Sequence, residues 1–121
     1  MGKTLLIAED SASMRQLISF TLKGAGYEVI EAEDGKDALG KVNGSQIDMF
    51  ISDLNMPNMD GIELLKQLRA NATFKFTPIV MLTTESQSSK VVEAKLAGVS
   101  GWIIKPFDPE KLIETVKKFL K

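Results

Sequence analysis

Residues 49–61 read Met-Phe-Ile-Ser-Asp-Leu-Asn-Met-Pro-Asn-Met-Asp-Gly, and the interpretation of the whole chain depends on them. An apolar run ends here at the carboxylate of Asp53, and Pro57 and Gly61 then break the pattern. A short apolar run that stops at turn residues is typical of a buried strand. The segment predicts that Asp53 stands where a buried strand passes into a loop. Taken alone, it fits equally well a strand end that simply meets solvent.

Four other short apolar runs resemble this one, at residues 4–8, 28–32, 79–82 and 101–104. Continuous apolar runs are typical of parallel strands that helices cover on both faces, whereas residues 28–32 alternate as an edge strand does. These runs predict a sheet of five strands.

Segments with helical spacing of apolar residues separate the runs, at residues 13–22, 37–42, 62–68, 88–97 and 109–120. Asp60 with Glu63, and Asp108 followed by Pro109, are typical helix starts, and Gly98 is a typical helix end. The fourth helix is predicted from Val91, Val92 and Leu96. Alternating strands and helices predict a single α/β domain with a doubly wound, five-stranded parallel sheet and five helices.

The charge of the chain is balanced, with 15 Lys and Arg residues against 16 Asp and Glu residues in 121. Bulk charge therefore favours neither nucleic acid nor an acidic membrane surface as a partner. No apolar run is long enough to cross a bilayer or to act as a signal peptide. We expect a soluble, cytoplasmic protein.

The chain contains no Cys and no His. These absences exclude disulfides, thiol chemistry, imidazole catalysis and His-based zinc sites. Any chemistry must use carboxylates, hydroxyls or lysines.

Polar residues follow four of the five predicted strands: Glu9 and Asp10, Asp53, Thr83, and Lys105. In doubly wound sheets, ligands bind beyond the carboxyl ends of the strands. We therefore expect these side chains to converge on one pocket.

Three converging carboxylates repel one another by about 4 kcal/mol per pair at 4 Å, if the effective dielectric constant is about 20. A hard divalent cation would offset this repulsion, and Mg²⁺ suits a site of few carboxylates that also takes water and phosphate oxygens. With Mg²⁺ bound, Asp53 is a candidate nucleophile for a phosphoryl group, and Thr83 and Lys105 are candidate ligands of the phosphoryl oxygens.

Other functions of this fold class find less support in the residues. The acidic pair Glu9-Asp10 would repel a flavin phosphate, and the chain has no Walker motif or dinucleotide fingerprint. A Mg²⁺-dependent phosphohydrolase would need a second acid near Asp53, but Asn55 stands two residues on. A purely structural interaction module that binds no metal is the third alternative.

These motifs resemble those of response-regulator receiver domains over nearly the whole chain. The resemblance rests on Glu9-Asp10, Asp53, Thr83 and the run Lys105-Pro106-Phe107. Residues 10–15 and 81–86 resemble more particularly the CheY-type chemotaxis regulators.

The resemblance implies a strand order of 2-1-3-4-5 and a phosphoacceptor role for Asp53, with phosphohistidine on a histidine kinase as the donor. It implies Mg²⁺ bound by Asp10, Asp53 and the backbone carbonyl of Asn55, with Glu9 reaching the ion through water. Glu9 departs from the more usual Asp at its position.

The resemblance also implies a switch. Thr83 would move toward the phosphoryl group, and Trp102 would take the place of the family's mobile aromatic residue. Asn55 and Glu85 match the positions that modulate hydrolysis of the acyl phosphate. Thr84 is larger than the small residue that often follows the switch hydroxyl, and this would narrow the entrance for the phosphoryl group. The bond between Lys105 and Pro106 is expected to be cis.

We accordingly expect a monomeric, stand-alone response regulator of a two-component system that controls chemotaxis through a flagellar motor switch protein. It would catalyse only its own phosphorylation and dephosphorylation. A phosphorelay intermediate and the receiver of a transcription regulator are the alternatives nearest to this role.

Overall fold

The structure is a computed structural model that describes residues 2–42, 46–84 and 88–120. Its strands are β1 (Thr4–Ala8), β2 (Glu28–Ala32), β3 (Met49–Asp53), β4 (Ile79–Thr83) and β5 (Gly101–Ile104). Its helices are α1 (Ala12–Gly24), α2 (Gly35–Lys41), α3 (Gly61–Ala70), α4 (Ser88–Ala97) and α5 (Pro109–Phe119), with a short 3-10 helix η1 (Ala72–Phe74).

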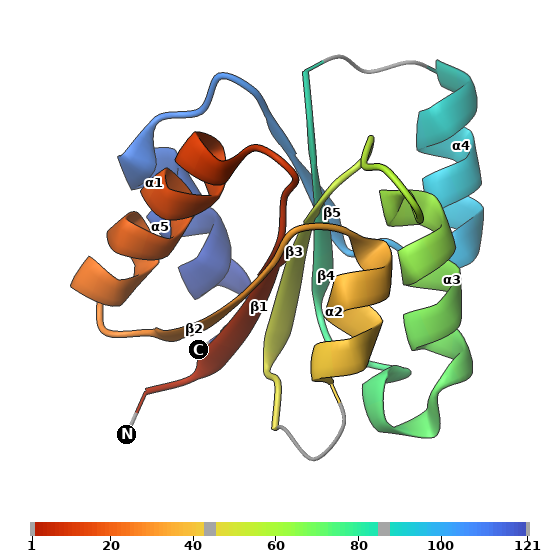
Figure 1. Cartoon of the computed structure of the whole chain (residues 1–121), viewed down its shortest axis with the longest axis horizontal. Helices are drawn as coiled ribbons and strands as arrows, with labels where there is room; N and C mark the ends of the chain where they lie inside the picture. Colours follow the sequence, from red (N-terminus) through yellow and green to blue (C-terminus); the bar gives the residue numbers. More distant parts are fainter. Residues whose placement is uncertain (1, 43–45, 85–87, 121) are drawn as a thin grey trace.

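The five strands form one parallel sheet in the order β2-β1-β3-β4-β5. Helices α1 and α5 lie on one face of this sheet, and α2, α3 and α4 lie on the other (Figure 1). The predicted doubly wound fold is confirmed, as is the strand order that the resemblance implied.

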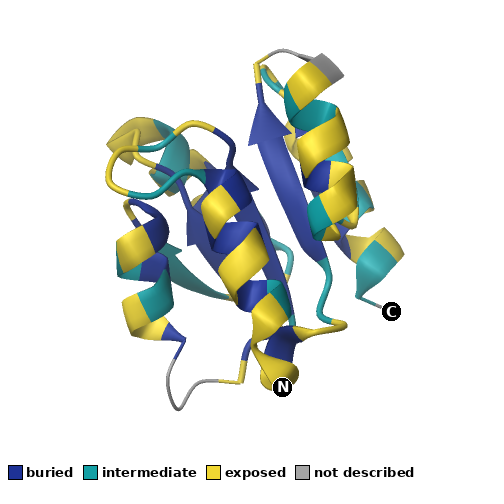
Figure 2. Ribbon diagram, turned by 90° about the vertical axis from the view of Figure 1, so that its right-hand side faces the viewer, coloured by how far each residue is buried: buried dark blue, intermediate teal, exposed yellow. Residues whose placement is uncertain are grey.

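Two apolar cores form because successive side chains of a strand point to opposite faces of the sheet. Leu6 and Phe50 belong to the core under α2, α3 and α4, whereas Leu5, Ile7 and Ile51 belong to the core under α1 and α5. All residues of β3 and β4 are buried, whereas exposed residues lie on the outer faces of the helices and in the loops (Figure 2). The continuous apolar runs in the sequence follow from this two-sided burial.

The helix starts follow the predicted signals. The side chain of Asp60 accepts a hydrogen bond from the amide of Glu63 at 2.9 Å, and that of Asp108 accepts one from Glu110 at 2.8 Å. Gly98, with φ of +99°, ends α4 in a backbone conformation that favours glycine. Helix α2 begins at Gly35, two residues before the predicted start, because Asp34 is its cap.

Helix α4 has the predicted bounds but does not bury the residues that predicted it. Val92 and Leu96 are 55% and 85% exposed, whereas Ala94 is fully buried. The helix packs against α3 at the side of the sheet, so its inward face is narrow. The small side chain of Ala94 suits that close approach.

Arg69 holds together the end of the molecule opposite the predicted site. Its guanidinium donates hydrogen bonds to the carbonyls of Phe74 and Thr77, both at 2.7 Å, and to that of Gly98 at 3.0 Å. These bonds satisfy carbonyls after α3 and α4 that no helix pairs. None of the helices in the described ranges is long and apolar enough to cross a membrane.

Candidate functional site

The strand register aligns the predicted site residues along the carboxyl edge of the sheet. Ala8 pairs with Ser52, Asp53 with Leu82, and Thr83 with Ile104. The next residues of β1 and β5, Glu9 and Lys105, therefore leave the sheet at nearly the same level as Asp53. The backbone of the sheet alone thus brings these residues to one edge.

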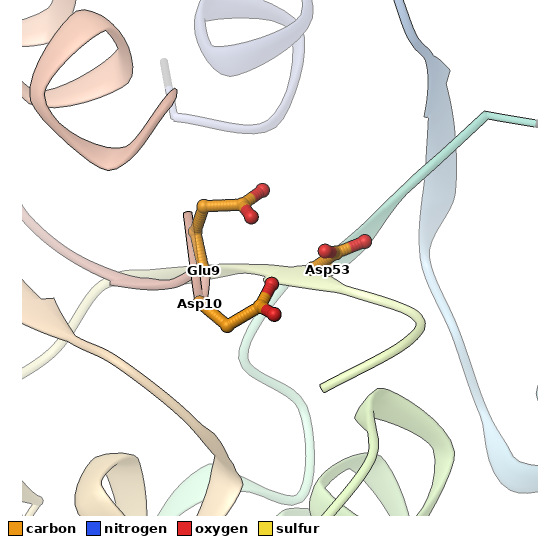
Figure 3. Close-up of side chains that lie close together, drawn as sticks. All are labelled: Glu9, Asp10 and Asp53. Atoms are coloured by element: carbon orange, nitrogen blue, oxygen red, sulfur yellow. The ribbon is translucent and has the colours of Figure 1, made fainter. Parts of the chain in front are cut away.

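Three carboxylates meet at this edge. Glu9 and Asp10 follow β1, Asp53 ends β3, and one oxygen atom from each lies within 4.8 Å of the others (Figure 3). Glu9 is 1% exposed and Asp53 is 8% exposed, whereas Asp10 is exposed to solvent. The cluster thus combines two buried acids with one at the surface.

Lys105 lies between the two buried acids. Its Nζ atom is 2.8 Å from Oε1 of Glu9 and 3.3 Å from Oδ2 of Asp53. The second oxygen of Glu9 accepts a hydrogen bond from the backbone amide of Ser11 at 3.1 Å. Both oxygens of Glu9 are thus engaged by protein donors.

Burial and the neighbouring charges shift the pKa values of Glu9 and Lys105. Burial raises the pKa of Glu9, and the charge of Asp53 raises it further. The hydrogen bonds from Lys105 and Ser11 lower this pKa but do not cancel the rise. Burial alone would lower the pKa of Lys105, but its hydrogen bond to Glu9 and the nearby Asp53 charge outweigh this effect and raise it. Lys105 is therefore a stable cation at neutral pH, and it offsets only part of the carboxylate charge.

The donor set fits Mg²⁺. The ion takes oxygen ligands at about 2.1 Å, so ligands on opposite sides of it lie about 4.2 Å apart. The three carboxylate oxygens lie within 4.8 Å of one another, which is close to that spacing.

The segment after Asp53 turns back sharply against the strand. The amide of Leu54 donates to the carbonyl of Leu82, and the amide of Gly61 donates to the carbonyl of Leu54, both at 2.9 Å. A Cβ atom at Gly61 would collide with the carbonyl oxygen of Asp53. Gly61 is therefore required for the turn, and Asn55 lies on the exposed loop that it closes.

Thr83 and Pro106 also lie at this edge of the sheet. Thr83 is buried at the end of β4, and its carbonyl accepts a hydrogen bond from the amide of Lys105 at 2.7 Å. Thr84 is exposed, and Glu85 lies outside the described residues. The bond between Lys105 and Pro106 is cis, as the resemblance implied.

Trp102 lies on β5, partly buried against the core under α2, α3 and α4. It also lines a groove of about 460 Å³ with Ile104, Pro106, Phe107 and the α5 residue Lys111. Ile104 is 50% exposed. The structure thus places Trp102 at the surface of β5 and α5.

Arg15 was not predicted as a site residue. Its guanidinium donates a hydrogen bond to the backbone carbonyl of Glu9 at 2.6 Å, and it forms an ion pair with Glu31 at 3.5 Å. Arg15 thereby ties the acidic turn after β1 to the neighbouring strand β2. The sequence carries no signal for this contact, because its acceptor is a backbone group.

Comparison with known proteins identifies the family. The response regulator receiver domain matches residues 5–117. The chain belongs to this family. The cluster of Glu9, Asp10 and Asp53 lies within the matched residues and could hold a metal ion.

Relatives of this receiver domain include chemotaxis proteins. It is 42% identical to the chemotaxis protein CheY1 of Helicobacter pylori over 118 residues, which cover 96% of this chain and 95% of CheY1. It is 36% identical to CheY of Pseudomonas aeruginosa, with 97% and 95% covered. The solved structure of CheY4 from Vibrio cholerae superposes with a TM-score of 0.95 at 46% identity, covering 98% of this chain and 99% of that one. The chain is thus a CheY-like receiver domain, a signalling protein of the two-component class.

Proposed function

We propose that this receiver domain accepts a phosphoryl group on Asp53 from a phosphohistidine of a chemotaxis-type histidine kinase in the cytoplasm. The observation that carries the proposal is the position of the Lys105 ammonium, 3.3 Å from Asp53 and 2.8 Å from Glu9. This arrangement sets one acceptor carboxylate beside both a cation and a candidate metal cluster. Phosphoryl transfer requires mainly such positioning and charge neutralisation.

In the transfer, a carboxylate oxygen of Asp53 forms a bond to phosphorus as the P–N bond of the phosphohistidine breaks. The electron pair of that bond stays on the imidazole nitrogen of the kinase, and the product on this chain is an acyl phosphate. The chain contains no His, so the donor lies outside these 121 residues.

Asp10, Asp53 and the backbone carbonyl of Asn55 would hold Mg²⁺, with Glu9 acting through water. Bound there, the ion would neutralise the carboxylates and the phosphoryl oxygens. Lys105 would exchange its contact with Asp53 for a phosphoryl oxygen, and the Thr83 hydroxyl would bind another. Asn55, Thr84 and Glu85 would set how readily water reaches the acyl phosphate.

The output is a change of protein binding. Movement of Thr83 toward the phosphoryl group would allow Trp102 to turn inward, which alters the surface formed by α4, β5 and α5. The exposed apolar residues Val92, Leu96 and Ile104 belong to this surface and suit a protein partner. By its similarity to CheY proteins, we propose that a monomer binds a flagellar motor switch protein there.

The fluorescence of the single Trp residue tests the switch. Beryllofluoride with Mg²⁺ should change the fluorescence of the wild-type chain and leave Asp53→Asn unchanged, while Trp102→Phe shows that the signal comes from Trp102. Incubation with a phosphorylated histidine kinase should yield a phosphoprotein by mass spectrometry. A wild-type chain that gives neither result would refute the proposal.

The output is tested separately. Affinity for a peptide from a flagellar motor switch protein should rise when beryllofluoride and Mg²⁺ are added. Equal affinity with and without them would leave the phosphoacceptor role intact but argue against motor output and for a relay or transcriptional role.

A further inference from the structure

The loop that follows Asp53, residues 54–60, contains a backbone conformation that needs support. Among the residues that the structure describes, Asn58 alone has a positive φ without being glycine, at 67°. Asn tolerates this left-handed region better than most residues, but it still requires surrounding contacts to hold it there.

The support comes from Asp34, the residue that caps α2. Asp34 is 5% exposed, and each of its carboxylate oxygens has a defined partner. Oδ2 accepts a hydrogen bond from the Nδ2 atom of Asn58 at 2.7 Å, and Oδ1 accepts one from the amide of Asp37 at 2.8 Å. One buried carboxylate therefore joins the N-terminus of α2 to the loop.

A backbone contact reinforces this connection. The amide of Gly35 donates to the carbonyl of Met59 at 3.3 Å, and a Cβ atom at position 35 would lie 2.7 Å from that same oxygen. The loop and α2 are thus in direct contact, and any larger residue at position 35 would push them apart. The start of the loop is joined to the residue after its end by the hydrogen bond from the amide of Gly61 to the carbonyl of Leu54 described above.

We propose that Asp34 is a positioning residue for the phosphoacceptor site, which through Asn58 holds residues 54–60 in the shape that presents the Asn55 carbonyl beside Asp53. This inference rests on the proposed function, because Asn55 is one of the groups that would hold Mg²⁺. Asp34 itself touches neither the ion nor the phosphoryl group. Its role is to hold the loop in place before Mg²⁺ binds, so that binding to the Asn55 carbonyl does not lose free energy to ordering of the loop.

A simple capping role would have different consequences. Loss of a cap lowers the free energy of unfolding but leaves the Mg²⁺ affinity of the folded protein unchanged. A positioning role predicts weaker Mg²⁺ binding even when the protein is fully folded. Asn58→Ala separates the two, because it removes the contact to Asp34 and leaves the hydrogen bond between Asp34 and Asp37 in place.

The experiment measures Mg²⁺ affinity by calorimetry in the wild type, Asp34→Ala, Asn58→Ala and the double variant. Each single variant should weaken binding about tenfold, the lower end of the loss seen when an outer contact of a metal site is removed. The double variant should be no weaker than the weaker single variant, because both changes break the same contact. The matched control is Asn71→Ala, which removes an exposed cap of η1 at the opposite end of α3 and should leave the affinity unchanged.

Hydrogen exchange of the metal-free protein gives a second measurement. The amides of residues 55, 56 and 58–60 should exchange faster in Asn58→Ala than in the wild type, and those of residues 72–74 should not change. Asn58→Ala also decides the question if Asp34→Ala fails to fold, because Asn58 is exposed.

Unchanged Mg²⁺ affinity in Asn58→Ala, or strictly additive losses in the double variant, would overturn the inference while leaving the proposed function intact. A wild-type chain that binds no Mg²⁺ would overturn the proposed function and this inference together. The two failures are therefore distinguishable.

Discussion

The ammonium group of Lys105 lies 2.8 Å from the carboxylate of Glu9, a residue 96 positions earlier in the chain. Glu9 is almost completely buried, and its other oxygen is bound by the amide of Ser11. Without metal or phosphoryl group, Lys105 therefore serves as the counter-ion of the acidic cluster. Binding of either ligand must compete with this internal arrangement or rearrange it.

Lys105→Met should destabilise the metal-free protein. It leaves Glu9 and Asp53 close together without a cation, and hydrogen bonds to charged groups contribute about 1.5–3 kcal/mol each. We expect the free energy of unfolding to fall by about 2 kcal/mol in urea titrations with chelator present. A variant as stable as the wild type would show that Lys105 does not neutralise the cluster. The exposed Lys66→Met, which loses a surface ion pair with Glu93, is the control and should change little.

Asp53→Asn should have the opposite effect in the same titrations. It loses the contact to Lys105 but removes repulsion from both Glu9 and Asp10, so we expect the metal-free protein to gain about 1 kcal/mol, the size expected of a partly screened charge pair. Equal or lower stability of the metal-free variant would mean that Lys105 already cancels the repulsion at Asp53.

Mg²⁺ should stabilise the wild-type protein against unfolding. At about 100 times its dissociation constant, a ligand that binds only the folded state adds about 2.7 kcal/mol. Thermal unfolding with increasing Mg²⁺ measures this gain, and Asp53→Asn should show a much smaller one. A melting temperature that does not depend on Mg²⁺ in the wild type would contradict the metal site.

The stability contributed by Asp34 should depend on pH. Hydrogen bonds from the amide of Asp37 and the side chain of Asn58 hold the pKa of Asp34 below its ordinary value of 3.8. The ionised Asp34 side chain therefore contributes its full stability above the pKa of an unfolded Asp, at a pH of about 4. This stability is lost as the pH falls through the lower pKa that Asp34 has in the folded state.

The measurement for Asp34 compares urea unfolding of the wild type and Asp34→Asn between pH 2 and pH 6 (approximate limits set by the Asp pKa). The difference in unfolding free energy between them should be constant above pH of about 4 and shrink below it. A difference independent of pH would mean that Asp34 has the same pKa in the folded and unfolded states.

The fold class and the convergence of Glu9, Asp10, Asp53 and Lys105 were predictable from periodicity and from the rule that parallel strands end at a common edge. The strand order that makes their strands neighbours came from the family resemblance. The contacts of Lys105 with both Glu9 and Asp53 were not predictable, because they depend on side-chain geometry. The contact between Asp34 and Asn58 was missed for a similar reason, since each residue taken alone is only a typical turn or cap residue.

The buried face of α4 could not be predicted from the sequence either. Val92 and Leu96 satisfy helical spacing, but that spacing cannot tell a core-facing side chain from one presented to solvent. The close packing of α4 against α3 leaves room inside only for a side chain such as Ala94.

The separation of Glu9 and Lys105 along the chain has a consequence for assembly. The first strand supplies the acid and the last strand leads to the base, with β3 and β4 between them in the sheet. Without β5 in the sheet, Glu9 and Asp53 would lack the ammonium group of Lys105. The proposed phosphoacceptor site is therefore complete only when the last strand of the chain has joined the sheet.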